Sequence, residues 1–172
     1  MKNIIIMSLL TFMTQICVHA QEIVEEAKLQ FELPNEHWRF IERKDHGHAL
    51  VYTYKRDFIL DSVGRKIDSQ ISFLIESVDS TADVVLYSIY KRSKTPFEVV
   101  SMFSHEDGTM KFKYGLGYQG KYFDSGLQHR IYVVYGIYNT MGITMVMDTT
   151  EEIAEIVGPE FLKTLKTFDT IE

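Results

Sequence analysis

The chain has 172 residues, of which 45% are hydrophobic and 24% are charged. This length suits one domain, and this composition excludes disordered and fibrous proteins. The formal charge of −6 excludes binding to nucleic acid by bulk electrostatic attraction. Aromatic residues make up 13% of the chain, which favours β-strands.

Residues 1–20 have the pattern of a secretory signal peptide. One basic residue precedes the apolar run Ile4–Phe12, and the stretch ends in Ala20. A small residue at this place suits signal peptidase, so we expect cleavage between Ala20 and Gln21. The apolar run is shorter than the ~20 residues that a membrane-spanning helix needs. We therefore expect residues 21–172 to form a periplasmic or secreted protein that has no transmembrane segment after signal cleavage.

Two other fates of this segment stay open, namely an uncleaved N-terminal anchor and lipidation at Cys17. A lipoprotein signal has a small residue before its cysteine, whereas Ile16 is bulky. If cleavage follows Ala20, the only cysteine leaves with the signal. The mature chain then has no disulfide, no catalytic thiol and no zinc–thiolate site. A secreted chain without disulfides is typical of bacteria.

Alternation of apolar and polar residues predicts that much of the mature chain is strand. Residues 21–28 are polar, and we expect a linker or a short helical turn there. Residues 84–90 are rich in Val and Tyr, which favours a strand, although a helix could also hold them. The other predicted strands are 29–33, 38–42, 50–60, 67–78, 110–114, 130–139 and 143–147.

Two helices are predicted. The first covers 95–105, because a threonine and a proline favour a helix start and apolar residues follow at helical spacing. Thr149 and Glu152 have the spacing of a capping box, and an apolar stripe predicts a terminal helix after them, broken or kinked at Gly158–Pro159. This order of elements is typical of an α+β protein with a mainly antiparallel sheet. The terminal helix must pack its stripe on one face of that sheet.

The sequence carries no specific catalytic signature, since it has neither a G-x-S-x-G nucleophile motif nor a Walker loop. Residues 115–120 match the letters G-x-G-x-x-G. A dinucleotide site needs a helix after this motif, whereas residues 121–123 have the composition of a strand. We interpret the glycines as a bent edge strand or a mobile loop, and we expect no cofactor.

Two histidine clusters are candidate sites. His46, His48 and Asp45 could bind a divalent metal, although a metal site needs three or four converging ligands. A polar hairpin turn is the alternative. His105 and Glu106 could act as a general base beside an acid, or they could simply end the first predicted helix.

Basic side chains come in pairs at several predicted strand ends. Converging at one rim, they could contact an anionic surface such as lipid headgroups or an envelope polymer; alternatively, they protect strand edges against aggregation. The pairs are Arg43–Lys44, Lys55–Arg56, Arg65–Lys66 and Lys91–Arg92. The residues that we expect to contact a partner are Lys91, Arg92, Lys94, Tyr118 and Tyr122.

Three local patterns combine in this chain: FELPNEHWRF at 31–40, KRSKTPFEVV at 91–100, and the hairpin RIYVVYGIYNTMGITMVMD at 130–148 that leads into the terminal helix. With these patterns, residues 29–169 resemble the PsbP-like fold family. That family includes extrinsic proteins of the photosynthetic oxygen-evolving complex and small bacterial envelope proteins such as DcrB. The resemblance implies an α/β/α sandwich with a central antiparallel sheet and an accessory or binding role without catalysis. It identifies no binding residue.

We therefore expect a single domain over residues 29–172. The function that we expect is that of a non-catalytic accessory protein of the bacterial envelope, which binds an envelope protein or another envelope component. One alternative is a metal-assisted hydrolase built on a His/carboxylate cluster. Another is a small-ligand-binding protein whose pocket lies between the sheet and the terminal helix.

Overall fold

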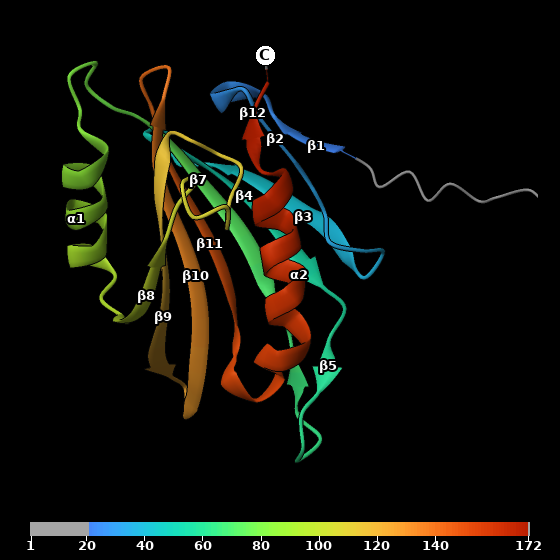
Figure 1. Cartoon of the computed structure of the whole chain (residues 1–172). Helices are drawn as coiled ribbons and strands as arrows, with labels where there is room; N and C mark the ends of the chain where they lie inside the picture. Colours follow the sequence, from blue (N-terminus) through green and yellow to red (C-terminus); the bar gives the residue numbers. More distant parts are fainter. Residues whose placement is uncertain (1–20, 172) are drawn as a thin grey trace, which may run out of the picture.

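The structure, a computed structural model, describes residues 21–171. Its main element is a seven-stranded antiparallel sheet with the strand order β3-β4-β7-β11-β10-β9-β8 (Figure 1). Helix α1 covers one face of this sheet and helix α2 the other (Figure 1). The expected α+β class and the sandwich are confirmed. The elements are β3 (Trp38–Asp45), β4 (Ala49–Arg56), β7 (Gln70–Ser77), α1 (Val84–Lys94), β8 (Glu98–Phe103), β9 (Gly115–Asp124), β10 (Leu127–Tyr138), β11 (Met141–Thr150) and α2 (Ala154–Thr167).

Smaller elements complete the fold. They are β1 (Gln21–Val24), β2 (Leu29–Glu32) and β12 (Asp169–Thr170) in a three-stranded sheet, the pair β5 (Ile59–Leu60) and β6 (Lys66–Ile67), and the 3-10 helices η1 (Glu25–Ala27) and η2 (Glu151–Ile153). Residues 21–28 are therefore a strand and a helical turn, so a linker is the wrong interpretation. Within residues 21–171, no helix is long and apolar enough to cross a membrane. The predicted signal peptide lies outside these residues.

The larger hydrophobic core lies between the sheet and α2. Because successive residues of a strand point to opposite faces, Tyr132 and Val134 of β10 face α2, whereas their neighbours face α1. Phe161 and Leu165 of α2 fill the space above them and are fully buried, as is Phe168 just after the helix. The place where we expected a ligand pocket is therefore packed with side chains.

A second, smaller core lies under α1. Ile131, Val133 and Tyr135 of β10 meet Tyr87 of α1 and Tyr118 of β9 there. The rings of Tyr87 and Tyr118 both pack edge-on against Tyr135. This core joins α1 to the centre of the sheet through aromatic side chains that also carry hydroxyl groups.

The helix predicted over 95–105 is wrong, and the helix lies just before it. Asp83 caps α1, because its side chain accepts hydrogen bonds from the backbone N–H groups of Val85 and Leu86. Pro96 has no N–H group to continue α1, which ends at Lys94.

The chain continues after Pro96 as the edge strand β8, which pairs with β9. A bulge between Val99 and Ser101 inserts one residue into β8. Phe97, Val100 and Phe103 lie three apart, which imitates a helix, although Val100 is exposed and Phe103 is buried in the larger core.

The strand predicted over 110–114 is also wrong. Met110 and Phe112 are buried on the α2 side of the sheet, while the residues between and after them are exposed. The N–H of Lys111 donates to the carbonyl of Leu165 in α2 at 3.0 Å. This segment is therefore a loop packed against a helix, and its alternation reflects burial on one side.

The predicted capping box does not form. The hydroxyl of Thr149 instead pairs with Ser69 at 2.7 Å, and the carboxylate of Glu152 accepts from the backbone and hydroxyl of Ser62. The chain passes through η2 into α2, and α2 continues through Gly158–Pro159 without a break.

The glycines at 115–120 lie in β9, a regular strand between β8 and β10, so neither the bent edge nor the mobile loop is correct. Glycine is needed at two of these positions because aromatic rings occupy the space of a side chain. A Cβ atom at Gly117 would overlap the ring of Phe103, and one at Gly120 would overlap the ring of Phe97.

Candidate functional site

Helix α1 presents apolar side chains to solvent. Leu86 is 68% exposed, Ile89 is 55% exposed and Tyr90 is 60% exposed. The inward face of the helix is polar by comparison: the hydroxyl of Tyr87 donates to Glu76 at 2.9 Å, and the hydroxyl of Ser88 lies 3.2 Å from that of Tyr118. The usual arrangement of an amphipathic helix is reversed here.

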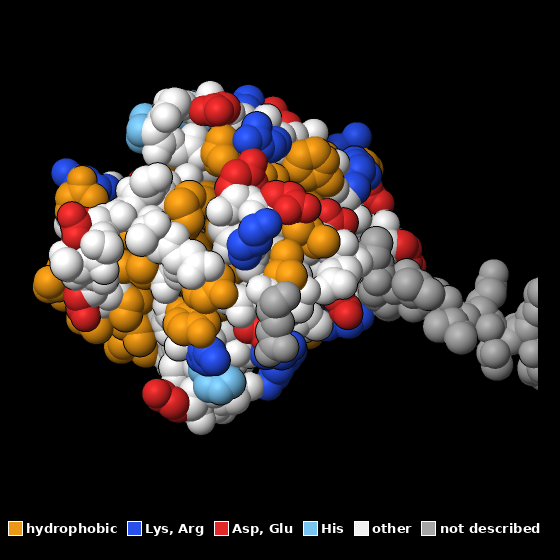
Figure 2. Space-filling model, turned by 90° about the horizontal axis from the view of Figure 1, so that it is seen from above, with side chains coloured by type: hydrophobic (Ala, Val, Ile, Leu, Met, Phe, Trp, Pro, Cys, Tyr) orange, Lys and Arg blue, Asp and Glu red, His pale blue; other side chains and the backbone are white. Residues whose placement is uncertain are grey.

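The edge strand β8 also exposes apolar side chains on the α1 side of the sheet. Met102 is largely exposed and pairs in the ladder with Tyr118, which contacts α1. Val100 of the same strand is also largely exposed. Figure 2 shows hydrophobic side chains gathering on the side of the molecule where α1 lies. We call the patch formed by Leu86, Ile89, Tyr90 and Met102 the α1–β8 surface.

Basic groups adjoin this surface at the C-terminal end of α1. The ammonium group of Lys94 lies 5.4 Å from the centre of the exposed Tyr90 ring. The guanidinium of Arg92 lies 4.7 Å from the centre of the Tyr118 ring and 5.7 Å from that of Phe97. The end of the α1–β8 surface therefore carries positive charge next to hydrocarbon.

The predicted partner contacts divide into accessible and internal residues. Lys94 is exposed and Arg92 is half-buried. Lys91 points inward and forms an ion pair with Glu76, Nζ to Oε1 2.8 Å. Tyr118 is buried under α1, so it supports the helix from below. Tyr122 is half-buried at the far end of β9.

The other basic pairs are held by acidic partners of their own. Each has one arginine in an ion pair that links two segments or closes a turn. These ion pairs are Arg43–Glu26, Arg56–Glu160 and Arg65–Asp61. Much of the basic character that the sequence displays is thus neutralised locally.

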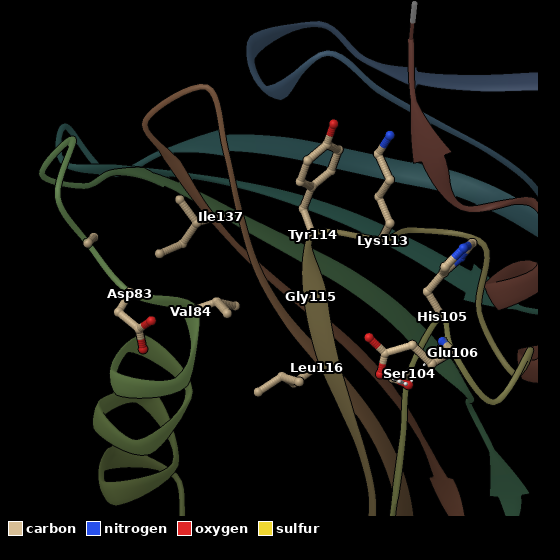
Figure 3. A pocket seen from close by; sticks show the side chains of 11 residues that line it. Asp83, Val84, Ser104, His105, Glu106, Lys113, Tyr114, Gly115, Leu116 and Ile137 are labelled. Atoms are coloured by element: carbon tan, nitrogen blue, oxygen red, sulfur yellow. Dashed lines mark hydrogen bonds between the residues drawn. The ribbon is translucent and has the colours of Figure 1, made fainter.

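His105 and Glu106 border an open cleft of about 360 Å³ between the start of α1 and the start of β9 (Figure 3). His105 follows β8 and does not end a helix. Its Nδ1 lies 2.8 Å from the carbonyl of Lys111, and a proton donated there leaves Nε2 unprotonated in the neutral ring. Glu106 accepts from Ser104, and Figure 3 shows the two side chains pointing in different directions. The expected base–acid pair is not joined by a hydrogen bond.

His46 and His48 lie in the exposed turn between β3 and β4, and Asp45 is the last residue of β3. The carboxylate of Asp45 accepts from the N–H of Gly47 at 2.7 Å, and the N–H of His46 donates to the carbonyl of Ala49 at 2.9 Å. Across residues 21–171, no group of three or more His, Cys, Asp or Glu side chains is arranged to hold a metal ion. The turn geometry accounts for the aspartate and the glycine of this motif.

Comparison with known proteins bears on the fold. No known family profile matches the sequence, and no curated protein is detectably similar to it. The solution structure of cyanobacterial PsbP (CyanoP) from Synechocystis sp. PCC 6803 superposes with a TM-score of 0.52 at 14% identity, covering 88% of this chain and 91% of that one.

The fold is PsbP-like. A crystal structure of the protein of unknown function PA94 from Pseudomonas aeruginosa is also similar, with a TM-score of 0.44 at 12% identity over 86% of this chain and 95% of that one. At such identities the likeness concerns the path of the chain alone. The residues that give this PsbP-like fold a function must be found in its own surface and cavities.

One polar cluster was missed by the sequence analysis. At the end of the PsbP-like sheet, Asp148 of β11 accepts from the hydroxyl of Tyr122 at 2.8 Å and lies 3.0 Å from Nδ1 of His129. The rings of Tyr122 and His129 stack with centroids 4.7 Å apart. If the predicted hairpin of 130–139 and 143–147 had been paired with the strand-like stretch 121–123, Tyr122, His129 and Asp148 would have fallen on one face of the sheet. The stretch 121–123, which has the composition of a strand, was too short to fix that register.

Proposed function

We propose that this chain is a non-catalytic binding protein that is exported from the cytoplasm and acts as an accessory protein in the bacterial envelope. The signal-like pattern of residues 1–20 supports export. The PsbP-like fold supports an accessory role only as an analogy. The partner in this proposal is an envelope protein.

The α1–β8 surface carries the proposal. Burying a Leu or Ile side chain that is otherwise exposed contributes about 1.5–3 kcal/mol, so Leu86 and Ile89 represent a large unused stabilisation. Exposed hydrocarbon that gathers on one side of a molecule is typical of surfaces that contact other proteins. In α1 the hydroxyl groups of Tyr87 and Ser88 face the sheet, whereas the side chains of Leu86 and Ile89 stay in solvent.

The charge around the surface specifies the partner further. All three charged residues of α1 are basic, and Lys94 lies at the exposed end. A partner with an apolar patch and acidic residues at one side would satisfy both features. We therefore propose a protein partner whose binding surface is apolar and acidic.

Site-specific photo-crosslinking in cells tests this proposal. A photoreactive phenylalanine analogue replaces Ile89 in one strain and Ile156 of α2, which is 53% exposed, in a matched control strain. We expect one dominant crosslinked protein from position 89 and none from position 156. In the Ile89 strain, the additional substitution Leu86→Lys should abolish the crosslink without changing the amount of folded protein.

Two results would contradict the proposal. Equal crosslinking from both positions would mean that the α1–β8 surface is not selective. A crosslink between two copies of this chain, with a dimer in sedimentation experiments, would mean that the surface serves self-association. Fractionation of the same cells tests export, since the protein should appear in the periplasm or the medium without residues 1–20.

A further inference from the structure

A partly enclosed cavity of about 290 Å³ lies on the α1 face of the sheet, beyond the C-terminal end of the helix. Its floor is formed by β10 and β11, with Ile131, Val133 and Val146. Pro96 and Phe97 of the α1–β8 connection cover it. It is lined by nine residues, none of which carries a charge. An apolar cavity of roughly 150 Å³ already holds benzene in a protein of known structure, so this one has room for a larger ring system.

Contacts with β9 and α1 hold the ring of Phe97, which covers the cavity, in place. The ring of Phe97 rests on Gly120 of β9, where any Cβ atom would overlap it. The guanidinium of Arg92 lies over the same ring, 5.7 Å from its centre. Gly120 leaves room for the ring of Phe97, and Pro96 fixes the backbone just before it. Together they keep the α1–β8 connection in the position that leaves the cavity open.

Hydroxyl groups supply the polarity of the cavity. Tyr122 is one of the lining residues and donates its proton to Asp148 at 2.8 Å, so its hydroxyl can offer a ligand only an acceptor. Tyr135 and Thr144 also line the walls. Burial raises the pKa of Tyr135 to about 12, so its hydroxyl is protonated at neutral pH. A ligand here meets neutral donors and acceptors on an otherwise apolar wall.

We propose that this cavity binds a small neutral ring compound that carries one hydrogen-bond donor, with its ring against Val133 and Val146 and its donor at the oxygen of Tyr122. An ionised ligand is disfavoured, because its charge would lose water and no lining residue carries a charge, while the nearby guanidinium of Arg92 already lies over the rings of Phe97 and Tyr118. A ligand with no donor would fit the walls and leave the oxygen unused. This inference does not depend on the partner proposed for the α1–β8 surface.

A titration followed by methyl NMR tests the cavity. Indole is the neutral probe with a donor, N-methylindole is the matched probe without one, and indoleacetate is the matched anion. We expect indole to shift the methyl signals of Ile131, Val133 and Val146. N-methylindole should bind about fivefold more weakly, as for the loss of one hydrogen bond, and indoleacetate more than about tenfold more weakly.

Two variants locate the binding. Val146→Phe fills the cavity and should weaken indole binding more than tenfold. The matched control Val100→Phe places the same ring on exposed strand β8 and should leave binding unchanged. Tyr122→Phe should remove the preference for indole over N-methylindole while it keeps the binding of both.

The proposal is overturned if indole shifts methyl groups elsewhere or none at all. It is equally overturned if indoleacetate binds best, or if Val146→Phe and Val100→Phe have the same effect. Each variant must retain the wild-type pattern of methyl signals outside the cavity, which shows that it is folded. If Val146→Phe does not fold, the loss of the preference for indole in Tyr122→Phe tests the location of the site instead. None of these results changes the crosslinks expected from position 89, so failure of the cavity and failure of the docking surface are distinguishable.

Discussion

Glu160 of α2 and Arg56 of β4 form an ion pair, with 2.9 Å between Oε2 and Nε, and both side chains are largely buried. The same carboxylate accepts hydrogen bonds from the indole of Trp38 at 2.7 Å and from the amide of Asn35 at 2.9 Å. One acidic residue of the terminal helix therefore fastens the helix to the β3–β4 side of the sheet. It lies at the end of the larger core, where the ring of Trp38 meets Phe161.

Removal of this carboxylate should destabilise the protein strongly. Glu160→Ala leaves the guanidinium of Arg56 and the indole N–H of Trp38 without their partner, and breaking a buried pair in this way costs about 3–5 kcal/mol. Urea unfolding measures the loss. The control is Glu155→Ala in the same helix, because Glu155 is 86% exposed in its ion pair with Arg130, and such pairs contribute at most about 1 kcal/mol. Equal losses in the two variants would contradict the role assigned to Glu160.

The same group should make stability depend on acid pH. Burial by itself would raise the pKa of Glu160, but hydrogen bonds from Arg56, Trp38 and Asn35 lower it below its usual value. A carboxyl whose pKa is lowered by folding stabilises the protein fully above its unfolded pKa, and this contribution is lost as the pH falls through the folded pKa. Unfolding free energies of wild type and Glu160→Gln should therefore converge between about pH 5 and about pH 2. A constant difference across this range would show that the charge of Glu160 is not responsible.

Two glycines should differ in how much an alanine costs. At Gly117 of β9, a methyl group would overlap the ring of Phe103, and overpacking of this kind costs about 1–3 kcal/mol. At Gly158 of α2, the nearest atom outside the adjoining chain is the hydroxyl oxygen of Tyr132 at 3.6 Å, which is ordinary contact. Alanine favours a helix over glycine by about 0.5–1 kcal/mol, but Pro159 directly after it disfavours the helical backbone at a residue with a Cβ atom, so Gly158→Ala should change the stability less than Gly117→Ala does. Thermal unfolding of the two variants tests this order, and a Gly158→Ala variant destabilised as much as Gly117→Ala would refute it.

The antiparallel sheet was predictable because its central strands alternate over many residues. The hairpin of β10 and β11 pairs Val133 with Val146 and Tyr135 with Thr144, in the register that the turn after residue 138 sets. Helix α1 was harder to predict, since its Val and Tyr residues favour strands and tertiary contacts decide the outcome. Asp83 was the local signal for the helix start, and it stands directly before that segment.

The candidate binding sites could be predicted only in part. Lys94 and Arg92 were identified as surface residues from charge alone. Leu86 and Ile89 were not, because a sequence pattern assigns apolar residues to the core and cannot show which face of a helix stays exposed. The cavity needs residues from four separate segments, among them Phe97 and Val146, and only the folded chain brings these together.

Helix α1 depends on its cap, which gives a last prediction. Asp83→Ala removes the acceptor for the N–H groups of Val85 and Leu86 and should cost about 1 kcal/mol. Asp83→Ser keeps a capping oxygen and should restore most of the stability. Hydrogen exchange gives a local reading, because the first-turn amides of α1 should exchange faster in the alanine variant while β10 and β11 are unchanged. If alanine and serine gave the same exchange rates, the helix start would be held by the packing of Tyr87 against Tyr135, and the cap would contribute nothing measurable.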